Sequence, residues 1–198
     1  MDYLKLKELK HYGIKGQKWG VRRYQNEDGS LTPEGRKRYS DTVFFSGSSK
    51  TQDPASEYYR KELPKTIQDK LDSYMNTKVK FVVGDAPGID RQVQDYLNNS
   101  SYKKVIIYGP NGIRYLANKN WKTKPIKAPK FEPGSKEWLA KKDIAMAYVA
   151  TKGLAVILDE GSSATRKNIQ RLIDQNKSVD VYELSKHGQS KDHWVDNK

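Results

Sequence analysis

The sequence predicts an α/β domain over residues 41–184, with a mainly parallel sheet and helices on both faces. Short apolar runs alternate along the chain with segments of helical periodicity, and each run ends in small or turn-forming residues. This alternation is typical of repeated strand-helix-strand units. Right-handed crossovers in such units bring every strand-to-helix loop to the same edge of the sheet.

Five apolar runs predict the strands. The runs are mostly apolar, as expected when both faces of a parallel sheet are covered, although Lys80 and Asp180 interrupt two of them. The predicted strands are residues 42–45, 79–83, 104–108, 154–158 and 178–182. Together with the alternation, these runs favour a Rossmann-like arrangement, in which ligands bind at the carboxyl ends of the strands.

Four segments between the strands predict helices. Ile89, Val93 and Leu97 show the clearest pattern, because they recur every four residues on one face. The predicted helices are residues 55–74 (interrupted by Pro64), 89–98, 135–150 and 164–176. Residues 111–134, rich in lysine, proline and glycine, are expected to form a long loop, and residues 185–198 a polar C-terminal tail.

Residues 1–40 differ in composition from the rest of the chain. Glycines recur too often there for a long helix or strand, and basic residues alternate with Tyr12, Trp19, Tyr24 and Tyr39. The segment is therefore expected to be an extended, basic, aromatic N-terminal tail.

Composition narrows the possible functions. The 198 residues fit one domain with an appendage, and the net charge of +13 favours anionic partners, although a solvated lysine surface would also account for it. The absence of cysteine excludes disulfides and thiolate metal sites, and the three histidines are far apart, so neither a metal nor another cofactor is expected. No apolar run is long enough to span a bilayer, so no membrane association is expected.

Small residues follow three of the predicted strands and suggest a site for a phosphorylated ligand. Glycine lets a ligand approach the backbone closely, and the N–H groups at the start of a helix favour an anion. The candidate ligand-binding residues in these loops are Ser46, Gly47, Ser48, Gly84, Asp85, Gly88, Gly161, Ser162, Ser163 and Thr165. No loop matches the Walker or G-x-G-x-x-G pattern, and each would also serve as an ordinary turn or helix cap.

Charged residues next to these loops complete the candidate site. Asp90 falls in the first turn of a predicted helix and is expected either to anchor the loop or to accept a hydrogen bond from a ribose or base. Arg91 and Arg166 are the expected side-chain partners of phosphate. If the protein is an enzyme, Asp90 or Asp159 would be its acid-base group.

Four stretches of the sequence together resemble the SLOG superfamily, which includes the DNA-processing and Lonely-guy proteins. The stretches are residues 43–48, 83–91, 142–146 and 159–169. The resemblance implies a Rossmann-like fold, a nucleotide or nucleotide-derived signal as ligand, and self-association into a homo-oligomer. The chain departs from the family at Ala164, where glycine is common. It also has Arg166, Lys167 and Asn168 where Lonely-guy enzymes place a catalytic glutamate, which favours binding over hydrolysis.

The N-terminal segment is similar to a tag on head-associated proteins of tailed phages. The matching residues are 11–24, 28–35 and 37–39. The tag implies a phage origin, a location in the host cytoplasm or the virion, and docking of residues 11–39 on a phage head protein or on DNA.

Three functions therefore remain open. The first is a phage protein that binds a nucleotide-derived signal and sequesters or senses a host defence signal. The second is a nucleotide N-glycosidase or hydrolase. The third is a virion-associated DNA-binding protein that depends on the basic tail.

Overall fold

The computed structural model describes residues 32, 41–127, 129–186 and 192–195. The chain divides into two units at residues 39 and 40, and everything below concerns the second, Ser40–Lys198. The predicted basic tail and the tag within it lie, apart from Thr32, outside the described residues.

Seven strands form one sheet in the order β4-β3-β2-β1-β5-β6-β7. All neighbouring strands are parallel except β6 and β7, which pair antiparallel. The strands are β1 (Thr42–Gly47), β2 (Lys80–Gly84), β3 (Val105–Pro110), β4 (Lys122–Ile126), β5 (Lys152–Leu158), β6 (Val179–Leu184) and β7 (His193–Trp194). The prediction of an α/β fold with a mainly parallel sheet is confirmed.

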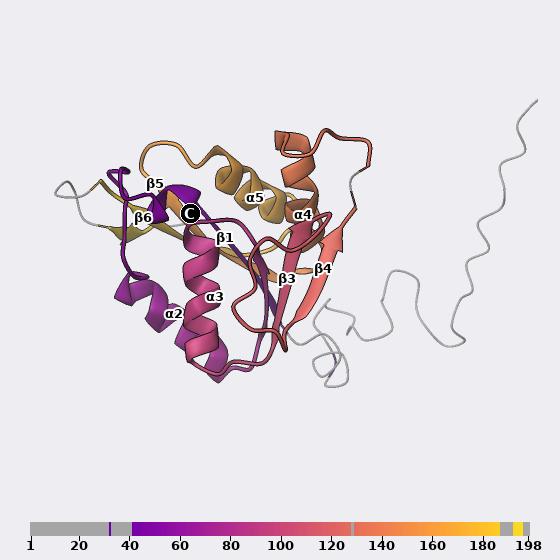
Figure 1. The fold of residues 1–198 in the computed structure, drawn as a ribbon. Coiled ribbons are helices and arrows are strands. Elements are labelled where there is room, and N and C mark those ends of the chain that lie inside the picture. The colour runs from indigo at the N-terminus through magenta and orange to yellow at the C-terminus, as the bar shows by residue number, and fades with distance from the viewer. Residues whose placement is uncertain (1–31, 33–40, 128, 187–191, 196–198) are drawn as a thin grey trace, which may run out of the picture. The chain divides into compact units, whose positions relative to one another are not determined.

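Helices cover the sheet on both faces (Figure 1). The helical elements are α2 (Lys65–Asn76), α3 (Ile89–Asn99), α4 (Lys136–Val149), α5 (Ser163–Ile173) and the short 3-10 helix η1 (Ser49–Gln52). Buried residues of α2 and α3 pack into one apolar cluster with the sheet, and those of α4 and α5 pack into another.

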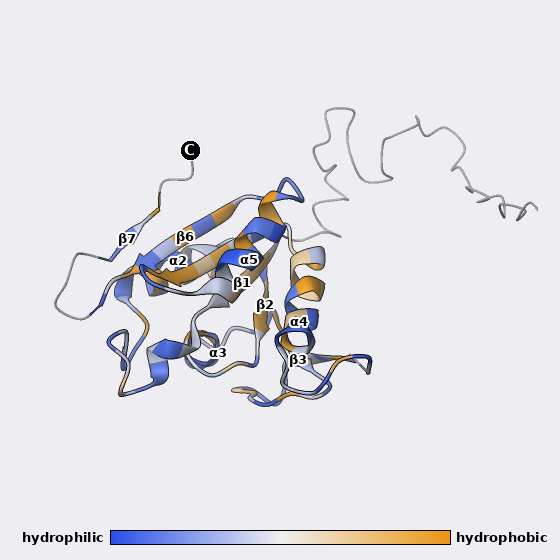
Figure 2. Cartoon of the chain, turned by 90° about the horizontal axis from the view of Figure 1, so that it is seen from above, coloured by the Kyte–Doolittle hydropathy of each residue, from blue (hydrophilic) through white to orange (hydrophobic). Residues whose placement is uncertain are grey.

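Successive strand residues alternate between the two clusters. In β1, Val43 and Phe45 join the cluster of α2 and α3, whereas Phe44 joins the cluster of α4 and α5. Because both faces are buried, β1 is apolar at consecutive positions. Figure 2 shows the same hydrophobic character for the neighbouring strand β2.

Pro64 sets the start of α2. The predicted helix over residues 55–74 is wrong in its first half, because α2 begins at Lys65 with Pro64 as its N-cap. Proline has no N–H to donate and its ring clashes with the preceding turn, so the helix cannot extend through it. Upstream of Pro64 the chain forms η1 and a series of turns.

Two strands occur where the sequence predicts none. β4 lies within the expected loop 111–134, because an exposed edge strand needs no apolar run and tolerates lysine and Pro125. β7 lies within the expected C-terminal tail 185–198, where Trp194 contacts the ring of Tyr182 with centroids 5.0 Å apart.

In the described part of the chain, no helix is long and apolar enough to cross a membrane.

Stability should depend on the α2 face of the core. Ile67 is 0% exposed on α2, whereas Ile173 is 50% exposed at the end of α5. Ile67→Ala should lower the free energy of unfolding by about 2–5 kcal/mol, because it leaves a cavity. The matched control Ile173→Ala should change it by less than about 1 kcal/mol. Urea unfolding of both variants tests this, and equal losses would contradict the packing described.

Candidate functional site

β1 is the strand at which the chain switches from one side of the sheet to the other. The chain first adds β2 and β3 on one side of β1 through crossovers on the α2 and α3 face. It then returns to add β5 and β6 on the other side, through crossovers on the α4 and α5 face. The carboxyl ends of β1 and β5 therefore border a crevice, the usual place for a ligand in an open parallel sheet.

A cavity of about 460 Å³ opens at this crevice. It is lined by the segments that follow β1, β2 and β5, by one side of α4, and by Arg114 from the loop after β3. The principal lining residues are Phe44, Ser46, Gly47, Ser48, Ser49, Lys50, Asp90, Arg114, Leu139, Lys142, Asp143, Met146, Ser162, Ser163, Ala164, Thr165 and Asn168.

Just over half of the predicted ligand-binding residues line this cavity. Those that do are Ser46, Gly47, Ser48, Asp90, Ser162, Ser163 and Thr165. Those outside its lining are Gly84, Asp85, Gly88, Arg91, Gly161 and Arg166.

Gly88 holds two of the lining loops together. Its φ of +88° is a conformation that glycine adopts readily, and a Cβ there would lie 2.5 Å from the carbonyl oxygen of Ser48. The next residue, Ile89, donates its N–H to that same oxygen over 3.1 Å. Gly88 therefore serves the site by closing the loop after β2 against the loop after β1.

Asp85 lies outside the cavity lining, but it binds Arg114, which is part of the lining. The Asp85 carboxylate, 1% exposed, accepts hydrogen bonds from Arg114 Nε at 3.1 Å and from a terminal guanidinium nitrogen at 2.5 Å. It also accepts one from the Arg114 backbone N–H at 2.9 Å. This charge-assisted, two-pronged pair fixes the guanidinium at the cavity. Arg114 lies in the expected loop 111–134, and no sequence signal distinguished it from the neighbouring lysines.

The other predicted charged residues are engaged away from the cavity. The Arg91 guanidinium lies 4.4 Å from the centre of the Tyr115 ring. Arg166 donates to the carbonyls of Gly161 and Leu158. Asp159 accepts a hydrogen bond from Tyr58, which holds the pKa of Asp159 below its usual value.

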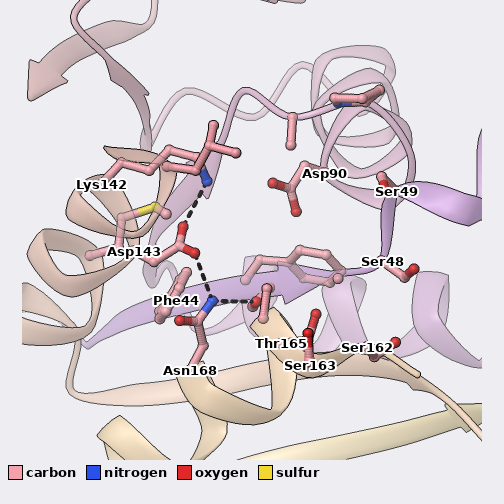
Figure 3. A pocket seen from close by; sticks show the side chains of 18 of the residues that line it. Phe44, Ser48, Ser49, Asp90, Lys142, Asp143, Ser162, Ser163, Thr165 and Asn168 are labelled. Atoms are coloured by element: carbon pink, nitrogen blue, oxygen red, sulfur yellow. Dashed lines mark hydrogen bonds and ion pairs between the residues drawn. The ribbon is translucent and has the colours of Figure 1, made fainter. Parts of the chain in front are cut away.

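A line of polar side chains forms one side of the cavity (Figure 3). Lys142 Nζ lies 2.7 Å from Asp143 Oδ1, and Asn168 Nδ2 donates to both Asp143 Oδ2 and Ser46 Oγ. Asn168 comes from α5 and the acid-base pair from α4, so the line joins helices that are separate in sequence. Nothing in the spacing of Lys142, Asp143 and Asn168 in the sequence marked them as site residues.

Asp90 projects into the cavity from the first turn of α3 (Figure 3). It is 5% exposed, and its Oδ1 is buried without a hydrogen-bond partner. Burial raises the pKa of Asp90 to about 7, although the nearby Lys142 charge partly opposes the rise. A buried carboxyl oxygen without a partner is costly, and a ligand donor would relieve that cost.

Gly84 makes room for Asp90 and Lys142 beside each other. A Cβ at this position would lie 2.4 Å from Asp90 Oδ2 and 2.7 Å from Lys142 Nζ. Lys142 is 6% exposed. Burial alone would lower the pKa of Lys142, but the charges of Asp143 and Asp90 outweigh burial, so its pKa is raised. The lysine therefore carries a full positive charge inside the cavity wall.

The start of α5 offers backbone donors to the same cavity. No side chain caps this helix, because Ser162 Oγ instead accepts a hydrogen bond from the Leu158 N–H, and the first turn holds no acidic residue. Among the described residues, the N–H groups of Ser163, Ala164 and Thr165 have no acceptor. Uncapped N–H groups and the helix dipole favour an anion at this position.

The remaining wall is apolar. Phe44 of β1 and Leu139 and Met146 of α4 line the cavity alongside its polar groups. The cavity thus combines an apolar wall, an anion-favouring helix end and a buried acid, within the volume range of small-molecule sites. Within the described residues, no group of three or more His, Asp or Glu side chains is placed to hold a metal ion.

Comparisons with known proteins find a match for the N-terminal part of the chain. Residues 6–26 match the model of a family of unknown function, DUF7211. This stretch overlaps the segment for which a phage tag is predicted, and it lies outside the described residues. No curated protein matches the chain, and no solved structure matches it.

Gly84→Ala should disturb the site because the added methyl group meets Asp90 and Lys142. We expect a loss of about 1–3 kcal/mol in the free energy of unfolding, the usual cost of overpacking. Gly112→Ala is the control, since a Cβ there would meet nothing within 4 Å. Chemical denaturation of both variants tests this, and an unchanged stability of Gly84→Ala would contradict the close approach.

The raised pKa of Asp90 predicts a specific pH dependence. The folded protein holds the Asp90 proton up to about pH 7, whereas the unfolded chain releases it near 3.8, so folding takes up a proton between these values. Stability relative to Asp90→Asn should therefore fall by on the order of 2–3 kcal/mol as pH rises from about 5 to 8. Denaturation of both proteins across this range tests the prediction. A constant difference between them would show that Asp90 titrates normally.

Proposed function

We propose that the domain is a Rossmann-like module that binds a nucleotide or nucleotide-derived molecule in the cavity at the ends of β1 and β5. The observation that carries the proposal is the meeting of the uncapped start of α5 with the unpartnered Asp90 carboxyl in one cavity. The first favours an anion and the second favours a hydrogen-bond donor. A nucleotide supplies both groups on one molecule.

Each part of a nucleotide has a matching surface in the cavity. The N–H groups of Ser163, Ala164 and Thr165 suit a phosphate, with Arg114 as an additional cation. Phe44 and Met146 suit the face of a base or sugar. Asp90 suits a ribose hydroxyl or a base amino group as donor.

The sequence resemblances suggest a setting for this binding. They point to a phage protein of the SLOG type, and a binding module of that kind would sequester or sense a nucleotide signal made in host defence. The chain lacks the glutamate that Lonely-guy enzymes use, which supports binding without cleavage.

A single substitution separates ligand binding from folding. Ala164→Glu places a carboxylate at the start of α5, where it should repel phosphate while leaving the helix as stable or more stable. The wild-type protein should gain about 2.7 kcal/mol with a nucleotide at about 100-fold its Kd. Ala164→Glu should lose this gain, and Ala55→Glu, an equal charge change at an exposed position outside the lining, should keep it.

Thermal shift against nucleoside monophosphates, cyclic dinucleotides and ADP-ribose derivatives measures these effects. No shift with any of them, or equal losses in the two glutamate variants, would reject the proposed site.

A nucleotide N-glycosidase is the second candidate, and Asp90 favours it. A carboxyl with a pKa of about 7 is suited to general acid catalysis near neutral pH. In its acid form, Asp90 would donate a proton to the departing base as the bond from C1′ to the base breaks. Water would then add to C1′ of the sugar and return a proton to the Asp90 carboxylate.

If the protein cleaves nucleotides, substitution of the two candidate acid-base residues should have different effects on base release. Asp90→Asn should abolish base release, whereas Asp159→Asn should not, because Asp159 is bonded to Tyr58 outside the cavity lining. Chromatography of nucleoside monophosphates after long incubation measures the free base. Intact nucleotide with the wild-type protein would exclude this activity and leave binding alone.

A further inference from the structure

One edge of the sheet carries an unbroken run of positive charge. Between Asp95 and Glu132 the sequence has seven lysines and Arg114 and no acidic residue. Arg114 is paired with Asp85, but six exposed lysines border the outer strand β4 and the ends of its neighbour β3. We call these six the lysine edge: Lys103, Lys104, Lys119, Lys122, Lys124 and Lys127.

The lysine edge keeps its positive charge within the described part of the domain. None of the six forms a salt bridge with a carboxylate of the described residues, whereas lysines elsewhere, such as Lys70 and Lys186, do. Lys104 donates only to the backbone carbonyl of Lys78, and Lys124 lies 5.7 Å from the centre of the Tyr108 ring. Six unpaired cations on one edge repel each other, and an external polyanion would relieve that repulsion.

The strand geometry places two of these cations, Lys122 and Lys124, on one face of β4. β4 lies beside β3 at the margin of the sheet (Figure 1), with Lys122 opposite Ile106 and Lys124 opposite Tyr108. Residues two apart on a strand point to the same face and lie about 6.6 Å apart. Two lysines and Pro125 on β4 are enough to discourage pairing with another strand. Edge protection does not account for the four lysines that lie off the strand.

We propose that the lysine edge binds the phosphate backbone of double-stranded nucleic acid without reading its sequence. Phosphate contacts need only a row of cations, whereas a protein partner usually buries an apolar or aromatic centre. The exposed large hydrophobic residues of the described chain are Ile144, Tyr148, Val149 and Ile173, on α4 and α5, and none belongs to the lysine edge. Trp121 and Tyr108 beside β4 are buried, so the edge offers no aromatic platform for unpaired bases. This surface belongs to the α/β domain and is separate from residues 11–39.

The test compares the full-length protein with two triple variants of equal charge. One variant is Lys119→Gln, Lys122→Gln and Lys124→Gln on the lysine edge. The control is Lys61→Gln, Lys136→Gln and Lys167→Gln, at exposed positions outside both the edge and the cavity lining. Fluorescence anisotropy with a mixed-sequence duplex of about 20 base pairs, at about 50–300 mM salt, gives the affinity and its salt dependence.

The edge variant should bind the duplex at least about tenfold more weakly than wild type at low salt. Its slope of log affinity against log salt should be smaller by about 2–3, because each lost phosphate contact removes about 0.9. The control should stay within about threefold of wild type. Both variants should melt like the wild type and keep any nucleotide-induced thermal shift, so the result is independent of the proposed pocket.

Four results would overturn the proposal. The first is no duplex binding by the wild type at the lowest salt. The second is an edge variant with wild-type affinity and slope, which would place the contacts elsewhere in the chain. The third is an equal loss in the two triple variants, which would show that only total charge matters. Tighter binding of a single strand than of the duplex would reject the stated preference.

Discussion

The parallel pairing of β1 with both β2 and β5 is the constraint on which the site depends. Parallel strands place their carboxyl ends at one edge, so the segments after these three strands meet without being near in sequence. The reversal of strand order at β1 sends the crossovers to opposite faces, and this opens a crevice between the loops. Contact of Gly88 with the Ser48 backbone then closes two of the loops against each other.

The polar and charged groups within the crevice differ in whether they have a hydrogen-bond or ion-pair partner. The Lys142 ammonium forms an ion pair with the Asp143 carboxylate. Asn168 donates hydrogen bonds to that carboxylate and to the Ser46 hydroxyl. Asp90 lies beside Lys142 over Gly84 but has a buried oxygen without a partner. The first turn of α5 has N–H groups without acceptors at the more exposed rim of the same cavity. A folded domain normally satisfies its buried polar groups, so the Asp90 oxygen is the buried position at which a ligand donor would supply the missing partner.

The positive charge of the domain is also unevenly distributed. Lys70, Lys142, Lys152 and Lys186 are paired with carboxylates, whereas the lysine edge has no such partners among the described residues. The net charge of +13, which belongs to the whole chain, thus includes lysines in two different environments. Paired lysines stabilise the fold locally, and unpaired ones create a field that acts on other molecules.

The sequence alone determined the class of fold and most of its regular elements. Apolar runs such as 154–158 predict buried parallel strands because both faces must be covered, and the spacing of Ile89, Val93 and Leu97 predicts α3. It also indicated which loops meet, since the carboxyl ends of parallel strands share an edge. It failed at β4 and β7, because strands at or near an edge need no continuous apolar run.

Only the tertiary structure decided which side chains enter the cavity. Arg91 and Arg166 follow the loops in sequence but turn to Tyr115 and to backbone carbonyls, whereas Arg114, Lys142 and Asn168 reach the cavity from distant segments. Local patterns report burial and turns, which depend on neighbours along the chain. The direction of a long side chain depends on partners brought near by folding, such as Asp85 for Arg114, and no spacing in the sequence records that.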